Sequence, residues 1–95
     1  AEMEQSNAAA HILTVASELA MLLGRNCRER RANLKMSQAE LSKRTGVAAS
    51  HLSNIENGRG NPTLEVLETI ADALHCSVVD LLAIDGREPG ERTGR

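Results

Sequence analysis

Between residues 37 and 58, apolar positions recur at helical spacing in two short stretches, which Thr45-Gly46-Val47 separates. Ser37 and Glu40 form the S-x-x-E arrangement, in which a hydroxyl and a carboxylate can each satisfy a backbone N–H at a helix start. Gly46 tolerates the left-handed conformation that a chain reversal needs. The pattern therefore predicts two short helices that meet at a steep angle.

The side chains of this helix pair divide into an inner and an outer set. The inner positions, which can meet between the two helices, are Leu41, Val47, Leu52 and Ile55. The outer positions are Gln38, Ala49, Ser50, Ser53, Asn54 and Asn57. The inner set predicts a scaffold and the outer set a surface that is available to a ligand. Two helices hinged in this way are a common means of placing a helix in the DNA major groove.

Helical spacing also extends to both sides of the pair. Apolar residues three and four apart predict one helix from about 7 to 32, which Gly24 is able to kink. Thr63 can cap the next helix, and Ser77 marks a further capped start. No stretch alternates between polar and apolar residues, so we predict an all-α fold of five helices plus an N-terminal helical extension.

We divide the 95 residues into three parts. Residues 1–22 form a partly helical extension, residues 23–84 one small domain, and residues 85–95 a tail. The tail has no apolar residue to anchor it, so we predict that it is disordered. The apolar face of the extension needs a cover, either by folding back on the domain or by pairing with a second copy, and the sequence favours neither.

Charge is distributed unevenly along the chain. The net charge is -2, yet residues 25–44 carry seven basic and two acidic side chains, while residues 1–24 carry three acidic and no Lys or Arg. Because attraction to phosphate depends on local basic surface, this segment favours contact with nucleic acid beside the helix pair. The composition has 0% aromatic residues, which removes the stacking platform that most single-strand binders use.

Catalytic and metal chemistry find no support in the sequence. Cys27 and Cys76 lie in apolar helical patterns and are interpreted as small hydrophobic residues rather than as a disulfide. The three histidines are scattered, and no nucleophile arrangement or phosphate-cradling glycine loop occurs. We therefore predict no enzyme activity, no metal and no cofactor.

The apolar stretch near the start of the chain is not interpreted as a targeting or membrane segment. Its leading residues are acidic, and Glu18 interrupts it. We therefore predict a cytoplasmic protein that has no membrane partner.

Six motifs occur in order between residues 23 and 82. They are Leu23-Gly24-x-x-Cys27-Arg28-x-x-Arg31, Ser37-Gln38-Ala39-Glu40-Leu41, Thr45-Gly46-Val47, Leu52-Ser53-Asn54-Ile55-Glu56-Asn57-Gly58, Pro62-Thr63-Leu64 and Ile70-Ala71-x-Ala73-Leu74. With these motifs the chain resembles the phage repressor and Cro-like (XRE-type) helix-turn-helix family. A single motif is easily matched by chance, whereas the ordered series is not. The resemblance implies a compact five-helix, lambda-repressor-like domain that binds operator DNA, usually as a dimer, with the helix from Ala48 to Glu56 as its reader.

The resemblance also implies roles for individual residues. The positions that would face bases are Ala49, Ser50, His51 and Asn54. The positions that would contact phosphates are Ser37, Gln38, Ser53, Asn57 and Arg59, and Gln38 would also brace the reader. Arg31 and Glu56 would form an ion pair that fixes the angle of the reader. Asn54 is the strongest candidate for specificity, because its amide can donate to and accept from an adenine edge together.

Three positions depart from the family pattern. Ala48 caps the reader where the family favours Ser or Thr, which weakens the helix start by about 1 kcal/mol. Ser42 stands where Ala or Gly is usual, because the two helices cross closely there. Ala49 stands where a glutamine often reads a base, which implies fewer direct base contacts or more reliance on DNA shape.

The sequence thus favours a sequence-specific regulator of transcription that binds double-stranded DNA. It would act as a homodimeric repressor or autoregulator on two half-sites of a palindromic operator, about 34 Å apart. The alternative is an antitoxin or other interaction module of the same fold. In that case residues 8–23 would dock a small protein partner, and DNA binding would be secondary.

Overall fold

The computed structural model describes the backbone of residues 2–84 and the side chains of residues 18–84. Five helices make up the described fold, and no strand occurs in that part of the chain. They are α1 (Glu2–Asn33), α2 (Gln38–Thr45), α3 (Ala49–Glu56), α4 (Leu64–Ala73) and α5 (Val78–Leu81). The prediction of an all-α, five-helix fold is therefore confirmed, while the predicted tail 85–95 lies outside the described residues.

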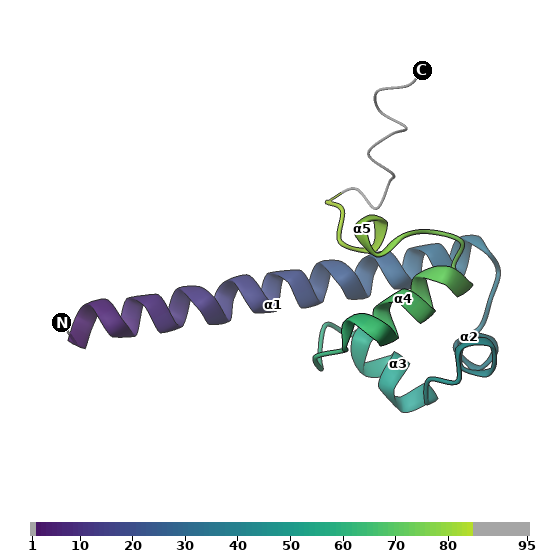
Figure 1. The fold of residues 1–95 in the computed structure, drawn as a ribbon, viewed down its shortest axis with the longest axis horizontal. Helices are drawn as coiled ribbons and strands as arrows, with labels where there is room; N and C mark the ends of the chain where they lie inside the picture. The colour runs from purple at the N-terminus through teal and green to yellow at the C-terminus, as the bar shows by residue number, and fades with distance from the viewer. Residues whose placement is uncertain (1, 85–95) are drawn as a thin grey trace, which may run out of the picture.

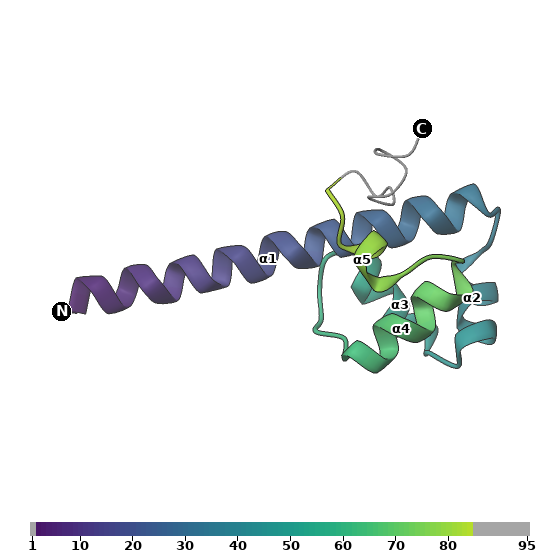
Figure 2. The same cartoon turned by 45° about the horizontal axis from the view of Figure 1, so that its top comes forward.

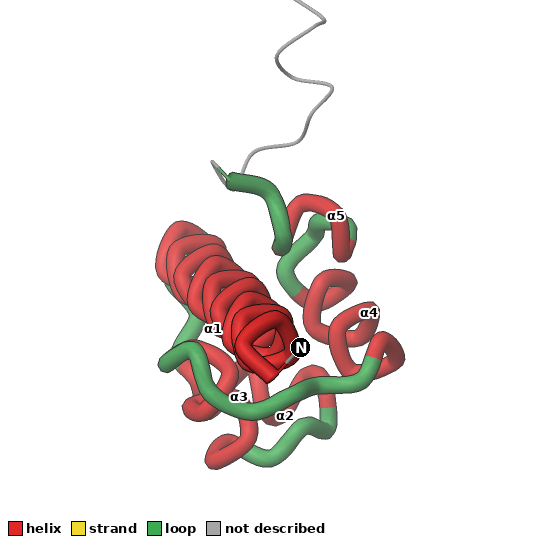
Figure 3. The backbone as a smooth tube through the Cα atoms, turned by 90° about the vertical axis from the view of Figure 1, so that its left-hand side faces the viewer, coloured by secondary structure: helices red, strands yellow, loops and turns green. Residues whose placement is uncertain are grey.

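The N-terminal extension and the first helix of the domain form one continuous helix. α1 begins at Glu2 rather than near Asn7, and it spans 32 residues, or about 48 Å at 1.5 Å per residue. Its C-terminal half lies along α2–α5, whereas its N-terminal half projects away from them (Figures 1 and 2). Seen from its N-terminal end, α1 lies over α3 on one side and beside α4 and α5 on the other (Figure 3). The N-terminal half does not fold back on the domain.

An aliphatic core joins all five helices. Its members are Leu23, Cys27, Met36, Leu41, Leu52, Ile55, Leu67, Ile70, Ala71, Leu74 and Leu81. Three of the four residues predicted to face inward are at most 1% exposed, and the fourth, Val47, packs against this core while partly buried. Burial of these side chains is the main favourable term that holds the short helices together.

Side-chain caps start three of the helices at the predicted residues. The hydroxyls of Ser37, Thr63 and Ser77 each accept a hydrogen bond from the backbone N–H three residues later. At Ser77 the reciprocal pair of cap bonds, known as a capping box, is complete, because the carboxylate of Asp80 accepts the N–H of Ser77 at 2.9 Å. At Ser37 only one of the two predicted cap bonds is present. Glu40 instead accepts a hydrogen bond from Arg44 at 2.9 Å, one turn further along the same face.

Gly24 allows close packing of α1 on α3, and the helix continues through it. A Cβ added at Gly24 would lie 2.5 Å from the carbonyl oxygen of Ile55 and 2.8 Å from that of Glu56. Both atoms belong to backbone, which cannot move aside as a side chain would. The expected role of Gly24 as a kink is thus replaced by a role in the contact between helices.

Cys27 is part of the core, as its apolar surroundings predict. Its side chain is 2% exposed, and both Cys27 and Cys76 are free thiols. Burial raises the pKa of Cys27 to about 12, and the nearby negative charge of Glu56 adds to the effect. The thiol therefore stays neutral and acts as a small apolar side chain.

Asn26 ties α1 to the end of α5, a role that the sequence did not suggest. Its amide nitrogen donates to the carbonyls of Leu81 and Ala83, both at 2.8 Å.

Among the described residues, no His, Cys, Asp and Glu side chains form a group that could hold a metal ion. No helix in that part of the chain has the length and apolar character needed to span a bilayer.

We expect Gly24→Ala to lower the free energy of unfolding by about 1–3 kcal/mol, because the added methyl group overpacks the α1–α3 contact. Urea unfolding followed by far-UV circular dichroism gives the value. Ala32→Gly, at an exposed site in the last turn of α1, is the control and reports helix propensity alone, a loss of roughly 0.5–1 kcal/mol. A gain in stability from Gly24→Ala, as propensity alone would give, would contradict the close approach.

Candidate nucleic-acid interface

α2 and α3 lie on the side of the body opposite α5 (Figures 1 and 3). One side of α3 packs into the core through Leu52 and Ile55, each 1% exposed. Its other side leaves Ala49, Ser50 and Asn54 exposed. The helix therefore presents a row of small and polar side chains outward from a fixed base.

His51 and Ser53 occupy the margins of this face. Both are half-buried rather than fully exposed. A half-buried residue can reach only part of a ligand that lies against α3, so these two positions fit the edge of an interface better than its centre.

The turn between α2 and α3 is held by hydroxyl groups. Thr45 donates to the carbonyl of Leu41 at 2.8 Å and accepts the N–H of Val47 at 3.1 Å. Gly46 adopts a left-handed conformation, with φ of 78°. Ser42 donates to the carbonyl of Val47 at 2.6 Å, so this departure from the family pattern adds a bond across the turn as well as being small enough to fit. These bonds set where α3 begins.

An ion pair fixes the other end of α3. Arg31 of α1 meets Glu56 in a two-pronged contact, Nε to Oε2 at 2.7 Å and Nη2 to Oε1 at 2.8 Å. Arg31 also donates to the carbonyl of Met36 at 2.8 Å, and Gln38 donates to Oε1 of Glu56 at 3.1 Å. One carboxylate thus connects α1, α2 and α3, and the bracing part of the role expected for Gln38 is present.

Glu56 remains charged although it is only 5% exposed. Burial by itself would raise its pKa, but hydrogen bonds from Arg31 and Gln38, with the charges of Arg31 and Arg28, lower the pKa below its ordinary value of 4.5. The same hydrogen bond raises the pKa of Arg31, against the opposing effect of burial. Both partners of the pair are therefore ionised at neutral pH.

Arg28 forms a second link from α1 to the end of α3. It donates to the carbonyl of Glu56 at 2.7 Å, and it lies 3.4 Å from the side-chain oxygen of Asn57. A cation at the C-terminal end of a helix also interacts favourably with the helix dipole. Sequence reasoning assigned Arg28 no role, although its position three residues before Arg31 places both arginines near one face of α1.

The positions predicted to contact phosphates gather at the two ends of this helix pair. The bond from Gln38 to Glu56 brings the start of α2 next to the end of α3. Just beyond that end, Asn57 donates from its amide to the carbonyl of Ser53 at 2.8 Å, and Arg59 is exposed. The backbone N–H of Arg59 donates to the carbonyl of Asn54 at 2.8 Å, which holds the loop against α3.

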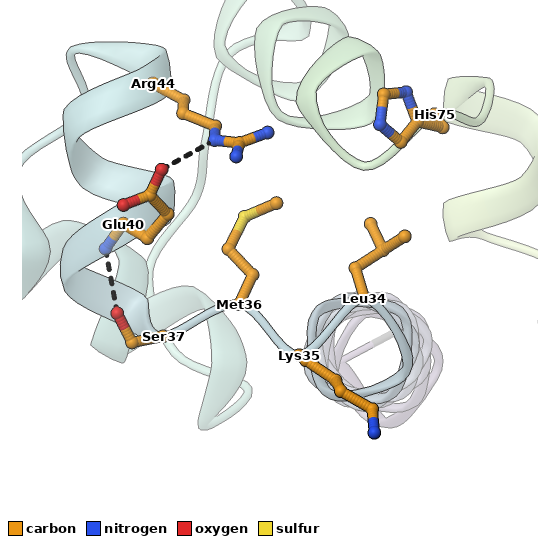
Figure 4. A pocket seen from close by; sticks show the side chains of 7 residues that line it. All are labelled: Leu34, Lys35, Met36, Ser37, Glu40, Arg44 and His75. Atoms are coloured by element: carbon orange, nitrogen blue, oxygen red, sulfur yellow. Dashed lines mark hydrogen bonds and ion pairs between the residues drawn. The ribbon is translucent and has the colours of Figure 1, made fainter.

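A polar hollow of about 420 Å³ lies beside the start of α2 (Figure 4). It is bounded by the α1–α2 connection, by α2 and by the residues that follow α4. Figure 4 shows the Ser37 hydroxyl bonded to the backbone nitrogen of Glu40, and the Arg44 side chain bonded to the Glu40 carboxylate. Lys35 and Arg44 are both exposed here, so the flank of α2 carries positive charge.

We expect Glu56→Gln to destabilise the protein most at neutral pH, with a difference from the unchanged protein that shrinks on acidification. The folded-state pKa of Glu56 is lowered, so its contribution is fully present above about pH 4.5 and is lost as the pH falls through the folded-state pKa. Urea unfolding at several pH values between neutral and acidic tests this. Glu40→Gln is the control, since its partner Arg44 is exposed and such pairs contribute little. Equal pH dependence of the two variants would contradict the assignment.

Ala48→Ser should raise the free energy of unfolding by about 1 kcal/mol, the usual contribution of a side-chain cap. Ala48 precedes α3 with φ of -57° and ψ of 142°, and it makes no side-chain cap hydrogen bond. Thermal and urea unfolding measure the gain. Ala49→Ser, one residue inside the helix, cannot form the same cap and should give no gain. If Ala48→Ser left stability unchanged, the helix start would already be satisfied by water.

Comparison with known proteins agrees with this geometry. The family model HTH_3, helix-turn-helix, matches residues 28–81. The chain is 33% identical over 72 residues to the uncharacterized HTH-type transcriptional regulator y4dJ of Sinorhizobium fredii, covering 76% of this chain and 94% of y4dJ. It is 34% identical over 68 residues to the immunity repressor protein of Bacillus phage phi105, covering 72% of this chain and 45% of the repressor.

Among solved structures, the fold is similar to that of SinR, the master regulator for biofilm formation, in complex with DNA. The TM-score is 0.61 at 37% identity, and the match covers 64% of this chain and 98% of the SinR chain. Sequence, family model and structure therefore lead to one conclusion. The chain belongs to the HTH_3 helix-turn-helix family of DNA-binding transcriptional regulators.

Proposed function

We propose that this protein is a homodimeric, sequence-specific regulator that inserts α3 into the major groove of a palindromic operator. The observation that carries the proposal is the two-sided character of α3. Leu52, Ile55 and Glu56 hold its inner side to α1 and α2, while Ala49, Ser50 and Asn54 are exposed on the outer side. A helix held on one side and exposed on the other is the form that groove reading requires.

Specificity rests on the chemistry of three exposed side chains. The side-chain carbonyl of Asn54 can accept a hydrogen bond from the N6 amino group of adenine while its amide nitrogen donates to N7, a paired contact that matches adenine. Ser50 can donate or accept, and so discriminates less. Ala49 offers a methyl group, which fits the methyl group of thymine. With a single bidentate reader, shape and flexibility of the duplex would supply part of the remaining preference.

Attraction to the duplex comes from groups around the two helices. Gln38 at the start of α2 and Asn57 and Arg59 beyond α3 would contact phosphates near the end of α3, with Ser37 and Ser53 nearby. Lys35 and Arg44 add positive charge on the flank of α2. These contacts would be largely independent of sequence and sensitive to salt.

A repressor or autoregulator is the mode of action that the relatives favour, since one similar protein is an immunity repressor. Two copies would read half-sites about 34 Å apart, one turn of DNA. As its ligand is DNA, the protein would work in the cytoplasm, at the nucleoid.

We expect Asn54→Ala to weaken binding to the preferred duplex by about 5- to 150-fold and to relax the preference for adenine at one position, the range for loss of a bidentate base contact. The preferred duplex is first selected from a random pool, and affinity is then followed by fluorescence anisotropy. Arg59→Ala is the matched control. It should lower the affinity for all duplexes alike and reduce the slope of log affinity against log salt concentration by about one.

Unchanged base preference in Asn54→Ala would overturn the assignment of Asn54 as reader. Absence of salt-dependent affinity for any duplex, together with co-purification of a small protein, would favour the interaction module of the same fold instead.

A further inference from the structure

We propose that an apolar groove on the side of α1 receives the N-terminal half of α1 from a second copy, which runs antiparallel to the first. This proposal deepens the homodimer of the proposed function and names the surface through which it forms. None of Ala49, Ser50 and Asn54 on the outer face of α3 lines this groove, and Arg59 is the one proposed phosphate contact at its edge.

The groove lies where α1 leaves the body of the domain. It encloses about 410 Å³ and is lined mainly by apolar side chains, with Leu19 and Leu23 of α1 on one side and Pro62, Leu67 and Leu82 on the other. Ile55 lies at its base, since it is 1% exposed and belongs to the core. The groove is thus an opening that leads from solvent to the central core.

In a single copy of the chain, the walls of the groove remain exposed to water. Leu19 of α1 is 49% exposed, and Leu82, which follows α5, is 37% exposed. An apolar helix laid between them would cover both side chains and the adjoining Pro62. Such burial is favourable in proportion to the apolar area removed from water.

The projecting half of α1 supplies a helix of matching character. Figures 1 and 2 show that this half lies clear of α2–α5. A helix of this length without packing partners is marginal in water, so its stability depends on a covering surface. In the sequence, Ile12, Val15 and Ala16 precede Leu19 at spacings of three, four and seven, which continue the apolar series that enters the groove.

The second copy is the occupant because the projecting half of α1 and one wall of the groove belong to the same helix. An apolar series that runs from the projection into the groove can pair with itself about a two-fold axis, so that each copy fills the groove of the other. No further protein is needed to cover either surface. The interface is closed and therefore limits assembly to two chains.

Charge decides the direction of the pairing. Residues 2–24 of α1 carry three acidic side chains and no Lys or Arg, whereas residues 25–33 of the same helix carry four Arg and one Glu. An antiparallel pair places the acidic start of one α1 beside the basic end of the other. A parallel pair would set like charges side by side, which is unfavourable.

The test is sedimentation of the full chain without DNA, with interference optics because the chain has no aromatic residue. The unchanged protein should be a dimer at micromolar concentration. Leu19→Arg and Leu82→Arg should each raise the dimer dissociation constant by at least about tenfold, the effect of exposing one large apolar side chain again. Val79→Arg, at a site on α5 that is 62% exposed and lies outside the groove, is the matched control and should leave the dimer unchanged.

The direction is tested by Glu4→Lys, which should weaken an antiparallel dimer and strengthen a parallel one. Glu65→Lys, on the exposed side of α4, is its control. Far-UV circular dichroism shows that each variant is folded, so that loss of the dimer is not loss of the domain.

Three results would overturn the proposal: a chain that stays monomeric at millimolar concentration, a dimer that Leu19→Arg and Leu82→Arg leave intact, or a dimer that Val79→Arg alone dissociates.

Measuring the affinity of the Leu19→Arg variant for a single DNA half-site separates this proposal from the proposed function. If the groove is wrong but α3 reads DNA, half-site affinity persists in all variants. If α3 does not read DNA, half-site affinity is absent whatever the state of assembly.

Discussion

The carboxylate of Glu56 is the point on which the arrangement of α1, α2 and α3 depends. Arg31 binds it with two nitrogens, Gln38 with one, and Arg28 binds the carbonyl of the same residue. Removing a charge from water is costly, and the attraction between partners offsets much of that cost without a large surplus. The main effect of this network is therefore to select one angle for α3 among those that an aliphatic core would tolerate.

Packing and electrostatics act together at this point. Gly24 lets α1 approach the last carbonyls of α3, and the same approach brings Arg28 and Arg31 within reach of Glu56. The core beneath consists of aliphatic side chains and one buried thiol, all of which pack without a directional preference. The orientation of α3 is set by the ion pair between Arg31 and Glu56 and by the hydroxyl hydrogen bonds at the α2–α3 turn. The result is a short helix whose outward face is set by contacts on its inner face.

Much of this architecture is local in sequence and was therefore predictable. Caps at Ser37, Thr63 and Ser77, the left-handed Gly46 and the inward residues of the helix pair depend on neighbours within a few positions. The family resemblance supplied the partner of Arg31. Features that depend on distant segments were not visible: the bond from Arg28 to the end of α3, the link from Asn26 to α5, and the contact that Gly24 allows. Glu40 shows the limit of motif reasoning, since Arg44 competes for its carboxylate within the same helix.

We propose that α3, held from within by Glu56, is the surface that meets DNA. Chemical-shift mapping of the isotope-labelled chain, titrated with its preferred duplex, locates the contacted residues. The largest changes should fall on Ala49, Ser50, Asn54 and the start of α2, while the amides of α4 and α5 should change little. Changes concentrated on α4 or α5, with those of α3 unaffected, would contradict it.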